Sequence, residues 1–215
     1  MSVHGLKVER SSIVITYVKI DPRQVSRDRL QEMIAGENAQ LIEAPGGPLI
    51  VNYEALPDTN CIINNRRIYL NQGGPTEPGE GHLAQMATVA AGAVRGSTIV
   101  AYGKNFEAKG SVEGVDNMGH FLRDRFLRDL DQLQTVFEGP VSWLSPRFKY
   151  VVGNIEYQLG IDPDREDETM FKARLNIHRA ADSLPDLEDL RLELREGFQY
   201  LRELLNKVLS VGAAA

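Results

Sequence analysis

The sheet of this protein can be read from residues 147–161, whose sequence is RFKYVVGNIEYQLGI. Gly and Asn at positions 153–154 suit a two-residue hairpin turn, because both tolerate the positive φ that such a turn requires. A turn there places Tyr150 opposite Tyr157, with further apolar pairs on either side. The stretch therefore predicts an antiparallel β-hairpin with a fixed register.

The strand that follows, residues 170–178 with the sequence MFKARLNIH, alternates between apolar and polar residues. Successive side chains of a strand point to opposite faces, so one face belongs to the core and the other is wet. If this strand pairs with the hairpin, the basic residues of both segments share the polar face. The sequence thus predicts a candidate surface for an anion or a partner, made of Arg147, Lys149, Lys172, Arg174 and His178.

Two interpretations of this polar face stay open. Four Lys and Arg residues stand against one carboxylate, Glu156, on a chain whose net charge is -6. Such a surface can hold a phosphate backbone or an acidic partner through charge-assisted hydrogen bonds. Surface charge more often serves solubility alone, with Lys and Glu paired across neighbouring strands.

Outward from this sheet, the chain alternates between strands and helices. Long strands are predicted at residues 7–20 and 98–109, and short antiparallel strands between residues 39 and 71. Small and apolar residues along 83–94 indicate a closely packed helix. Residues 117–137 carry apolar residues at spacings of three and four, and they predict one continuous helix.

The last helix is expected to begin near Ser183, with Asp186 as the acid of a capping box. Its main apolar stripe, from Leu187 to Val208, is wide enough to cover a sheet. A second partial stripe makes the apolar surface wider than one sheet contact needs. The candidate partner-helix surface consists of Leu192, Tyr200 and Leu204.

Residues 7–94 and 98–209 show the same order of elements: a long strand, a helix, three or four antiparallel strands and a helix. This order resembles the fold of TATA-box-binding proteins, in which two such halves form a curved sheet backed by helices, and helix-grip folds share part of it. The resemblance involves no motif residues, so it implies a fold and no activity. We expect an α+β fold, mainly antiparallel curved sheet backed by helices, in a single domain over residues 1–215.

Composition places the chain among ordinary globular proteins, with 42% hydrophobic and 25% charged residues. Its acidic pI, near 5.3, argues against nonspecific coating of nucleic acid or anionic membrane. Cys61, the only cysteine, lies in an apolar run and is interpreted as a core residue. The lack of any possible intrachain disulfide and of a long apolar run predicts a cytoplasmic protein with no membrane contact.

Signatures of catalysis, metal binding or cofactor binding are missing from the sequence. The four histidines are far apart, and the glycine-rich residues 73–81 lack the Lys and Ser or Thr of a P-loop. We therefore expect no cofactor and lean against an enzyme. The leading hypothesis is a non-catalytic protein–protein interaction subunit of a cytoplasmic assembly, which binds itself or another protein. The alternatives are a nucleic-acid-binding module that uses the basic sheet face, and an enzyme or small-molecule binder with a pocket between sheet and helices.

Overall fold

A computed structural model describes residues 2–31, 33, 38–43, 46–56, 58–127, 130–137 and 140–210 of the chain. Its strands form one nine-stranded sheet in the order β2-β3-β4-β5-β1-β6-β9-β8-β7, and every neighbouring pair is antiparallel. The strands are β1 (Val3–Tyr17), β2 (Ala39–Glu43), β3 (Leu49–Tyr53), β4 (Asn60–Ile63), β5 (Arg67–Gly73), β6 (Ile99–Val112), β7 (Arg147–Val152), β8 (Ile155–Pro163) and β9 (Met170–Ala180). The expected combination of a large antiparallel sheet with helices is confirmed.

The helices follow the same chain order, and a short 3₁₀ turn (Pro22–Gln24) precedes the first of them. They are α1 (Arg27–Gln31), α2 (Leu83–Ala93), α3 (Met118–Phe126), α4 (Leu130–Val136) and α5 (Leu187–Ser210). Among the described helices, none is both long and apolar enough to cross a membrane.

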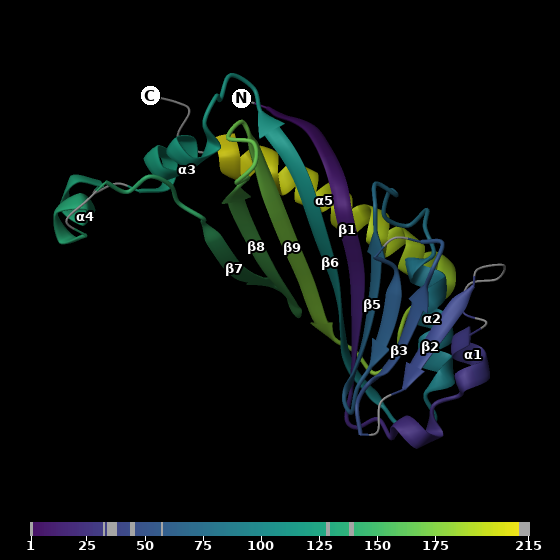
Figure 1. The fold of residues 1–215 in the computed structure, drawn as a ribbon. Helices are drawn as coiled ribbons and strands as arrows, with labels where there is room; N and C mark the ends of the chain where they lie inside the picture. Colours follow the sequence, from purple (N-terminus) through teal and green to yellow (C-terminus); the bar gives the residue numbers. More distant parts are fainter. Residues whose placement is uncertain are drawn as a thin grey trace.

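Strands β1 and β6 lie at the centre of the sheet, which is strongly curved (Figure 1). In β1, Ile13 and Ile15 are fully buried, whereas Ser12 and Val14, which alternate with them along the strand, are only half-buried. This alternation shows that one face of the sheet is packed and the other is partly open to water. The prediction of a central strand from apolar residues on both faces is confirmed.

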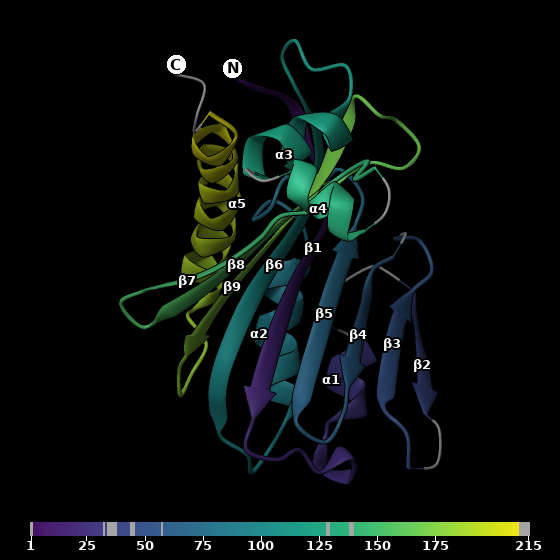
Figure 2. The same cartoon turned by 90° about the vertical axis from the view of Figure 1, so that its left-hand side faces the viewer.

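Helices α2 and α5 cover the packed face (Figures 1 and 2). The buried stripe of α5, which includes Leu194, Phe198 and Leu201, packs into one core with strand residues such as Phe106 and Leu175. On this face the inward-pointing apolar side chains of the strands pack against the apolar sides of the helices. The described helices leave the middle of the other face, called here the open face, uncovered (Figure 2).

The C-terminal hairpin and strand have the register that the sequence predicts. Tyr150 lies opposite Tyr157, and the flanking apolar pairs are also as expected. In β9 the apolar set is buried, while Arg174 and His178 on the alternate positions are exposed. The predicted division of this strand into a core face and a wet face is therefore correct.

The single helix predicted over residues 117–137 is wrong, because the structure has two short helices there. Helix α3 ends at Phe126, and the backbone of the next residue, Leu127, is extended at φ -114° and ψ 107°. Met118 and Leu122 in the first part of the apolar stripe are buried, but Val136 and Phe137 at its end are 72% and 66% exposed. Figure 1 shows α4 standing away from the sheet, so nothing in the described chain supports a continuation of the helix.

Two local predictions also need correction. Cys61 pairs with Leu70 rather than with Ile68, because Asn64 closes the turn: its Oδ1 accepts hydrogen bonds from the N–H groups of Arg66 and Arg67. The last helix begins at Leu187 rather than near Ser183. Asp186 itself is the cap, since its carboxylate accepts from the N–H of Asp189 at 2.9 Å.

Candidate functional site on the open face

A groove of about 570 Å³ lies on the open face. Residues of β1, β5 and β6 line one side of it, and residues of β7, β8 and β9 line the other. Arg147, Lys149 and Arg174 line this groove, as the sequence-based surface requires. Lys172 and His178 share the face through alternation along β9 but lie outside the groove lining.

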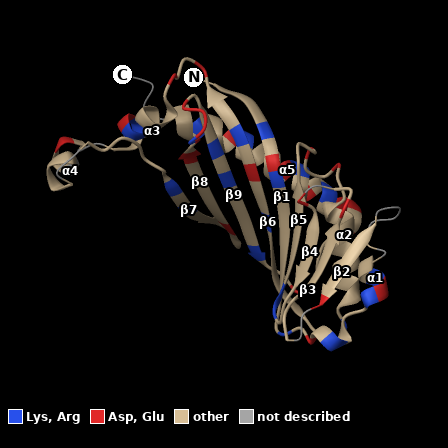
Figure 3. Cartoon of the chain, in the orientation of Figure 1, with Lys and Arg blue, Asp and Glu red and all other residues tan. Residues whose placement is uncertain are grey.

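Each of the four predicted cations lies near a carboxylate on the same face. The pairs are Lys149–Glu156 at 2.8 Å, Arg147–Asp162 at 2.6 Å, Arg174–Glu107 at 3.6 Å and Lys172–Asp164 at 3.9 Å. Figure 3 shows Lys and Arg interspersed with Asp and Glu over these strands rather than gathered in a stripe of one sign. The excess of positive charge is therefore smaller than the sequence alone suggests.

The pKa shifts of two of these carboxyl groups favour ionised pairs. Hydrogen bonds from Lys149 and Gln158 lower the pKa of Glu156. Burial is the largest single influence on Asp164 and opposes its ionisation, but three groups together outweigh it and lower the pKa overall: the ammonium of Lys109, 2.5 Å from Oδ2, the backbone N–H of Glu166 and the charge of Lys172. Both groups are charged at neutral pH and hold their cations in place.

The groove lining also includes residues outside the predicted basic surface, and four of them are carboxamides: Asn71, Asn105, Gln158 and Asn176. Paired strands bring one outward-facing residue from each strand into a line across the whole sheet, which we name the amide row. In sheet order, the amide row consists of Gln40, Asn52, Asn60, Asn71, Ser12, Asn105, Asn176, Gln158 and Lys149. Its central members line the groove.

A weak signal for the amide row was present in the sequence. Asn is depleted in strands because it does not favour a pleated, half-buried surface. Asn52, Asn71, Asn105 and Asn176 nevertheless lie inside strands, where they interrupt apolar or charged neighbours. Only the sheet order shows that they lie in one line, because their strands are far apart along the chain.

The candidate surface on the C-terminal helix is largely used within the protein. The Tyr200 hydroxyl lies 2.9 Å from the Tyr150 hydroxyl, and its ring is 5.2 Å from the ring of Tyr157. Burial, as the largest cause, raises the pKa of Tyr150 and of Tyr157. Leu204 is half-buried against the core, so Leu192, at 49% exposure, is the one member left open.

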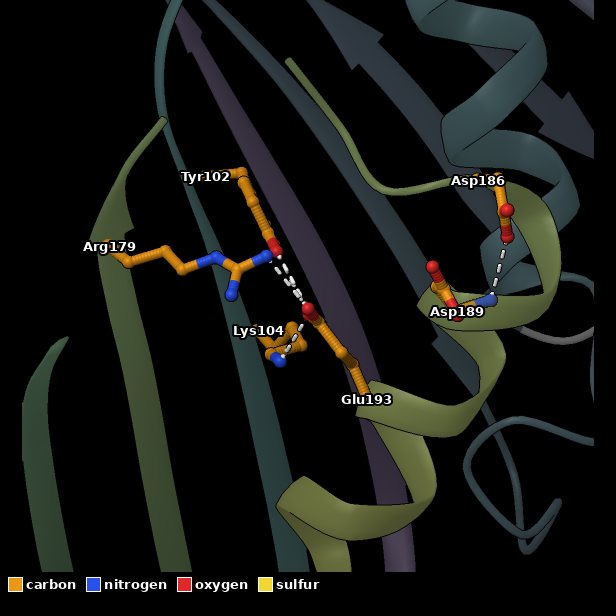
Figure 4. A network of polar contacts seen from close by, with 6 residues as sticks. All are labelled: Tyr102, Lys104, Arg179, Asp186, Asp189 and Glu193. Carbon is orange, nitrogen blue, oxygen red and sulfur yellow. Dashed lines mark hydrogen bonds and ion pairs between the residues drawn. The ribbon is translucent and has the colours of Figure 1, made fainter. Parts of the chain in front are cut away.

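A polar network fixes the first half of α5 to the sheet (Figure 4). The carboxylate of Glu193 accepts hydrogen bonds from the hydroxyl of Tyr102, from Lys104 Nζ at 2.7 Å and from Arg179 at 2.7 Å. Arg179 also lies over the ring of Tyr102, 4.6 Å from its centroid. Because every charged end in the network has a partner, we assign it a structural role in seating the helix.

Cys61 is fully buried, which confirms its interpretation as a core residue. Burial raises the pKa of its thiol to about 12, so the thiol is protonated at neutral pH. Within the described part of the chain, no group of three or more His, Cys, Asp or Glu residues is placed to hold a metal ion.

No protein-family model matches this chain, and no curated protein matches it either.

Proposed function

We propose that this protein is a non-catalytic binding subunit whose open sheet face receives a segment of a partner protein. The observation that carries the proposal is the groove of about 570 Å³ on a sheet face that no described helix covers at its centre. Its lining combines uncharged hydrogen-bonding groups, such as Asn105 and Asn176, with ion-paired Arg147 and Arg174. Arg is enriched in protein interfaces, which carry on the order of ten direct hydrogen bonds, so this lining suits a protein partner.

The nucleic-acid hypothesis draws on the same basic residues but is supported less well. Binding to a phosphate backbone requires cations that are free to replace counterions. The cations at positions 147, 149, 172 and 174 each face a carboxylate, which would have to be displaced or repelled. A nucleic-acid ligand would therefore have to break these ion pairs before it could bind.

A matched pair of photoreactive variants tests the proposal. Gln158 lines the groove and Gln199 lies on the outer side of α5, and both are exposed. Each is replaced by p-benzoylphenylalanine in the full chain, and the protein is irradiated in native lysate with and without nuclease. We expect one cross-linked protein from position 158 that resists nuclease, and none from position 199.

Three results would reject the proposal. Equal cross-linking at both positions would mean nonspecific contact, and no cross-link at position 158 would mean that the groove is unused. A cross-linked product at position 158 that is lost on nuclease treatment, and whose yield falls steeply as the salt concentration rises, would mean that the groove binds nucleic acid.

The likeness of the two halves is a second proposal, about the fold. In each half the first strand pairs with the last, β1 with β5 and β6 with β9, and β1 and β6 join the halves. These pairings support an arrangement similar to that of TATA-box-binding proteins over residues 7–94 and 98–209. The N–H of Val3 donates to Asn206 Oδ1 at 2.9 Å, so the two ends of the fold are close. A circular permutant that joins them and opens between Val94 and Ser97 should fold cooperatively; an insoluble product would count against independent halves.

A further inference from the structure

The open face carries three parallel rows of side chains, one for each of three successive outward positions of the strands. Residues opposite one another on paired strands lie side by side, so strand register defines the rows. The charged row consists of Arg10, Glu107, Arg174, Gly160 and Arg147. The amide row comes next, and beyond it the apolar row consists of Ile42, Ile50, Ile62, Tyr69 and Val14. Past Gly103 of β6 the same line continues into the polar residues His178 and Glu156. The middle parts of all three rows meet at the groove.

The amide row keeps hydrogen-bonding capacity for a ligand. Asn71 Nδ2 donates to Asn60 Oδ1 at 2.9 Å, and Asn105 Nδ2 donates to the hydroxyl of Ser12 at 3.1 Å. A carboxamide has two N–H donors and an acceptor oxygen, so each of these bonds uses only part of the group. Among the described residues, no side-chain hydrogen bond engages Asn176 in the same row. Like a peptide bond, each of these carboxamides offers an N–H donor and a C=O acceptor, so they can form hydrogen bonds with the C=O and N–H groups of a peptide main chain.

The distance between rows matches the repeat of an extended peptide. Adjacent rows are two residues apart along each strand, which is about 6.6–6.8 Å. A peptide laid along β1 and β6 repeats its side-chain direction over the same two residues. Its side chains at positions i, i+2 and i+4 therefore lie above the three rows in turn.

The two outer rows differ in chemistry, and this difference would fix which end of the ligand lies over which row. The charged row holds three guanidinium groups and one carboxylate, and within the described chain Arg10 has no ion-pair partner. A carboxylate on the ligand can take that free guanidinium through bidentate hydrogen bonds. In the apolar row, Val14 and Tyr69 are half-buried and line the groove, so their side chains can contact an aliphatic group of the ligand.

We infer that the groove binds an extended peptide segment with an acidic residue, a polar residue and an aliphatic residue at positions i, i+2 and i+4. The acidic residue contacts the charged row, the polar residue contacts the amide row and the aliphatic residue contacts the apolar row. The inference rests on the proposed function, because it names the partner segment that the open face would receive.

Fluorescence anisotropy of labelled synthetic peptides with the full chain tests this pattern. The probes carry Asp-Ser-Asn-Ser-Leu or the reverse order, since the peptide can run in either direction along β1. We expect one of the two orders to bind about tenfold more tightly than either a peptide with Asn in place of Asp or a peptide of the same composition with the spacing broken. These comparisons need no change in the protein, so they hold even if a variant fails to fold.

The variant Arg10→Gln, combined with the Asp and Asn peptides, completes a double-mutant cycle between protein and peptide. It should bind the Asp peptide about tenfold less tightly and the Asn peptide as well as before, because only the charged contact is lost. Arg95→Gln, at an exposed position between α2 and β6, removes the same charge elsewhere and should change neither affinity.

Each remaining outcome overturns the inference in a distinguishable way. Equal affinity for the intact and broken spacings would reject the three-row pattern. If no peptide binds while position 158 still cross-links to a protein, the proposed function stands and the peptide inference falls. If an oligonucleotide displaces the peptide from the groove, the open face recognises a different class of ligand.

Discussion

The replacement Gly197→Ala in α5 tests how tightly that helix is seated on the sheet. A Cβ atom at position 197 would come within 2.8 Å of Cε2 and 2.9 Å of Cζ of Phe106, and within 3.2 Å of Ile177. Phe106 is fully buried on the central strand β6, so its ring has little freedom to move aside. The added methyl group therefore has to displace either the helix or the ring.

Two opposing effects set the size of the change. Replacing Gly by Ala inside a helix stabilises it by about 1 kcal/mol through intrinsic propensity. Overpacking a close-packed core costs about 1–3 kcal/mol, and contacts below 3.0 Å with a ring place this site toward the upper end. We expect a net loss of about 1–2 kcal/mol in the free energy of unfolding. For a chain of this size, that loss lowers the melting temperature by roughly 2–8 °C.

Urea denaturation measures the effect, with Gly92→Ala as the matched control. Gly92 is exposed near the end of α2, where a Cβ would meet only the tip of the Arg29 side chain at 3.3 Å. The same substitution there should leave stability unchanged or raise it by up to about 1 kcal/mol. If Gly197→Ala were as stable as the parent protein, the close contact between α5 and Phe106 would be refuted.

Three further predictions concern the ion pairs and the tyrosine cluster. Glu193→Ala should destabilise the fold by about 2–4 kcal/mol in urea denaturation, because it leaves the buried Lys104 and the half-buried Arg179 without a carboxylate; a loss below about 0.5 kcal/mol would contradict the network. The pKa of Asp164 is lower in the folded chain than in the unfolded chain, so its stabilising effect is present above the unfolded pKa of about 3.9 and is lost as the pH falls through the folded pKa. Asp164→Asn should therefore lower stability at pH 7 and make stability fall less steeply as the pH decreases. Thermal unfolding across pH 2–7 measures this, and a melting temperature that falls as steeply in acid as that of the parent protein would refute it. Tyr200→Phe should lower the free energy of unfolding by about 0.5–1.5 kcal/mol, because it removes the hydrogen bond to Tyr150. Leu192→Ser should change the same free energy by no more than about 0.5 kcal/mol, because Leu192 is exposed. A larger loss from Leu192→Ser than from Tyr200→Phe would mean that the exposed part of α5 contributes more to stability than the tyrosine cluster does.

Sequence reasoning succeeded where neighbours in the chain are also neighbours in the sheet. The register of β7 and β8 followed from the turn at 153–154, and the two faces of β9 followed from strict alternation. In both cases a local pattern decides which side chains point inward. The predicted basic residues were consequently placed on the correct face.

The same reasoning failed where the outcome depends on distant segments. The carboxylates that neutralise Arg174 and Lys172 come from β6 and from the loop after β8, so a count on the polar residues of the hairpin and β9 missed them. Residues 117–137 have the periodicity of one helix, but in the described part of this segment Val136 and Phe137 are largely exposed, and periodicity alone does not stabilise a helix in water. The amide row likewise requires the order of all the strands.

The groove and the core are the two sides of the same strands, so the packing of α5 bears on recognition. Asn105 and Glu107 face the groove, and Phe106 between them points to the helix. A displacement of Phe106 by a methyl group at position 197 would tilt this segment of β6 and shift the middle of both the amide row and the charged row. Gly197→Ala should therefore weaken peptide binding although position 197 lies on the packed side of the sheet and reaches the groove only through Phe106. A stabilising change on the outer side of α5 should leave binding unaltered. If the open face binds a peptide as we propose, the absence of a side chain at position 197 serves that face as well as the packing of the core.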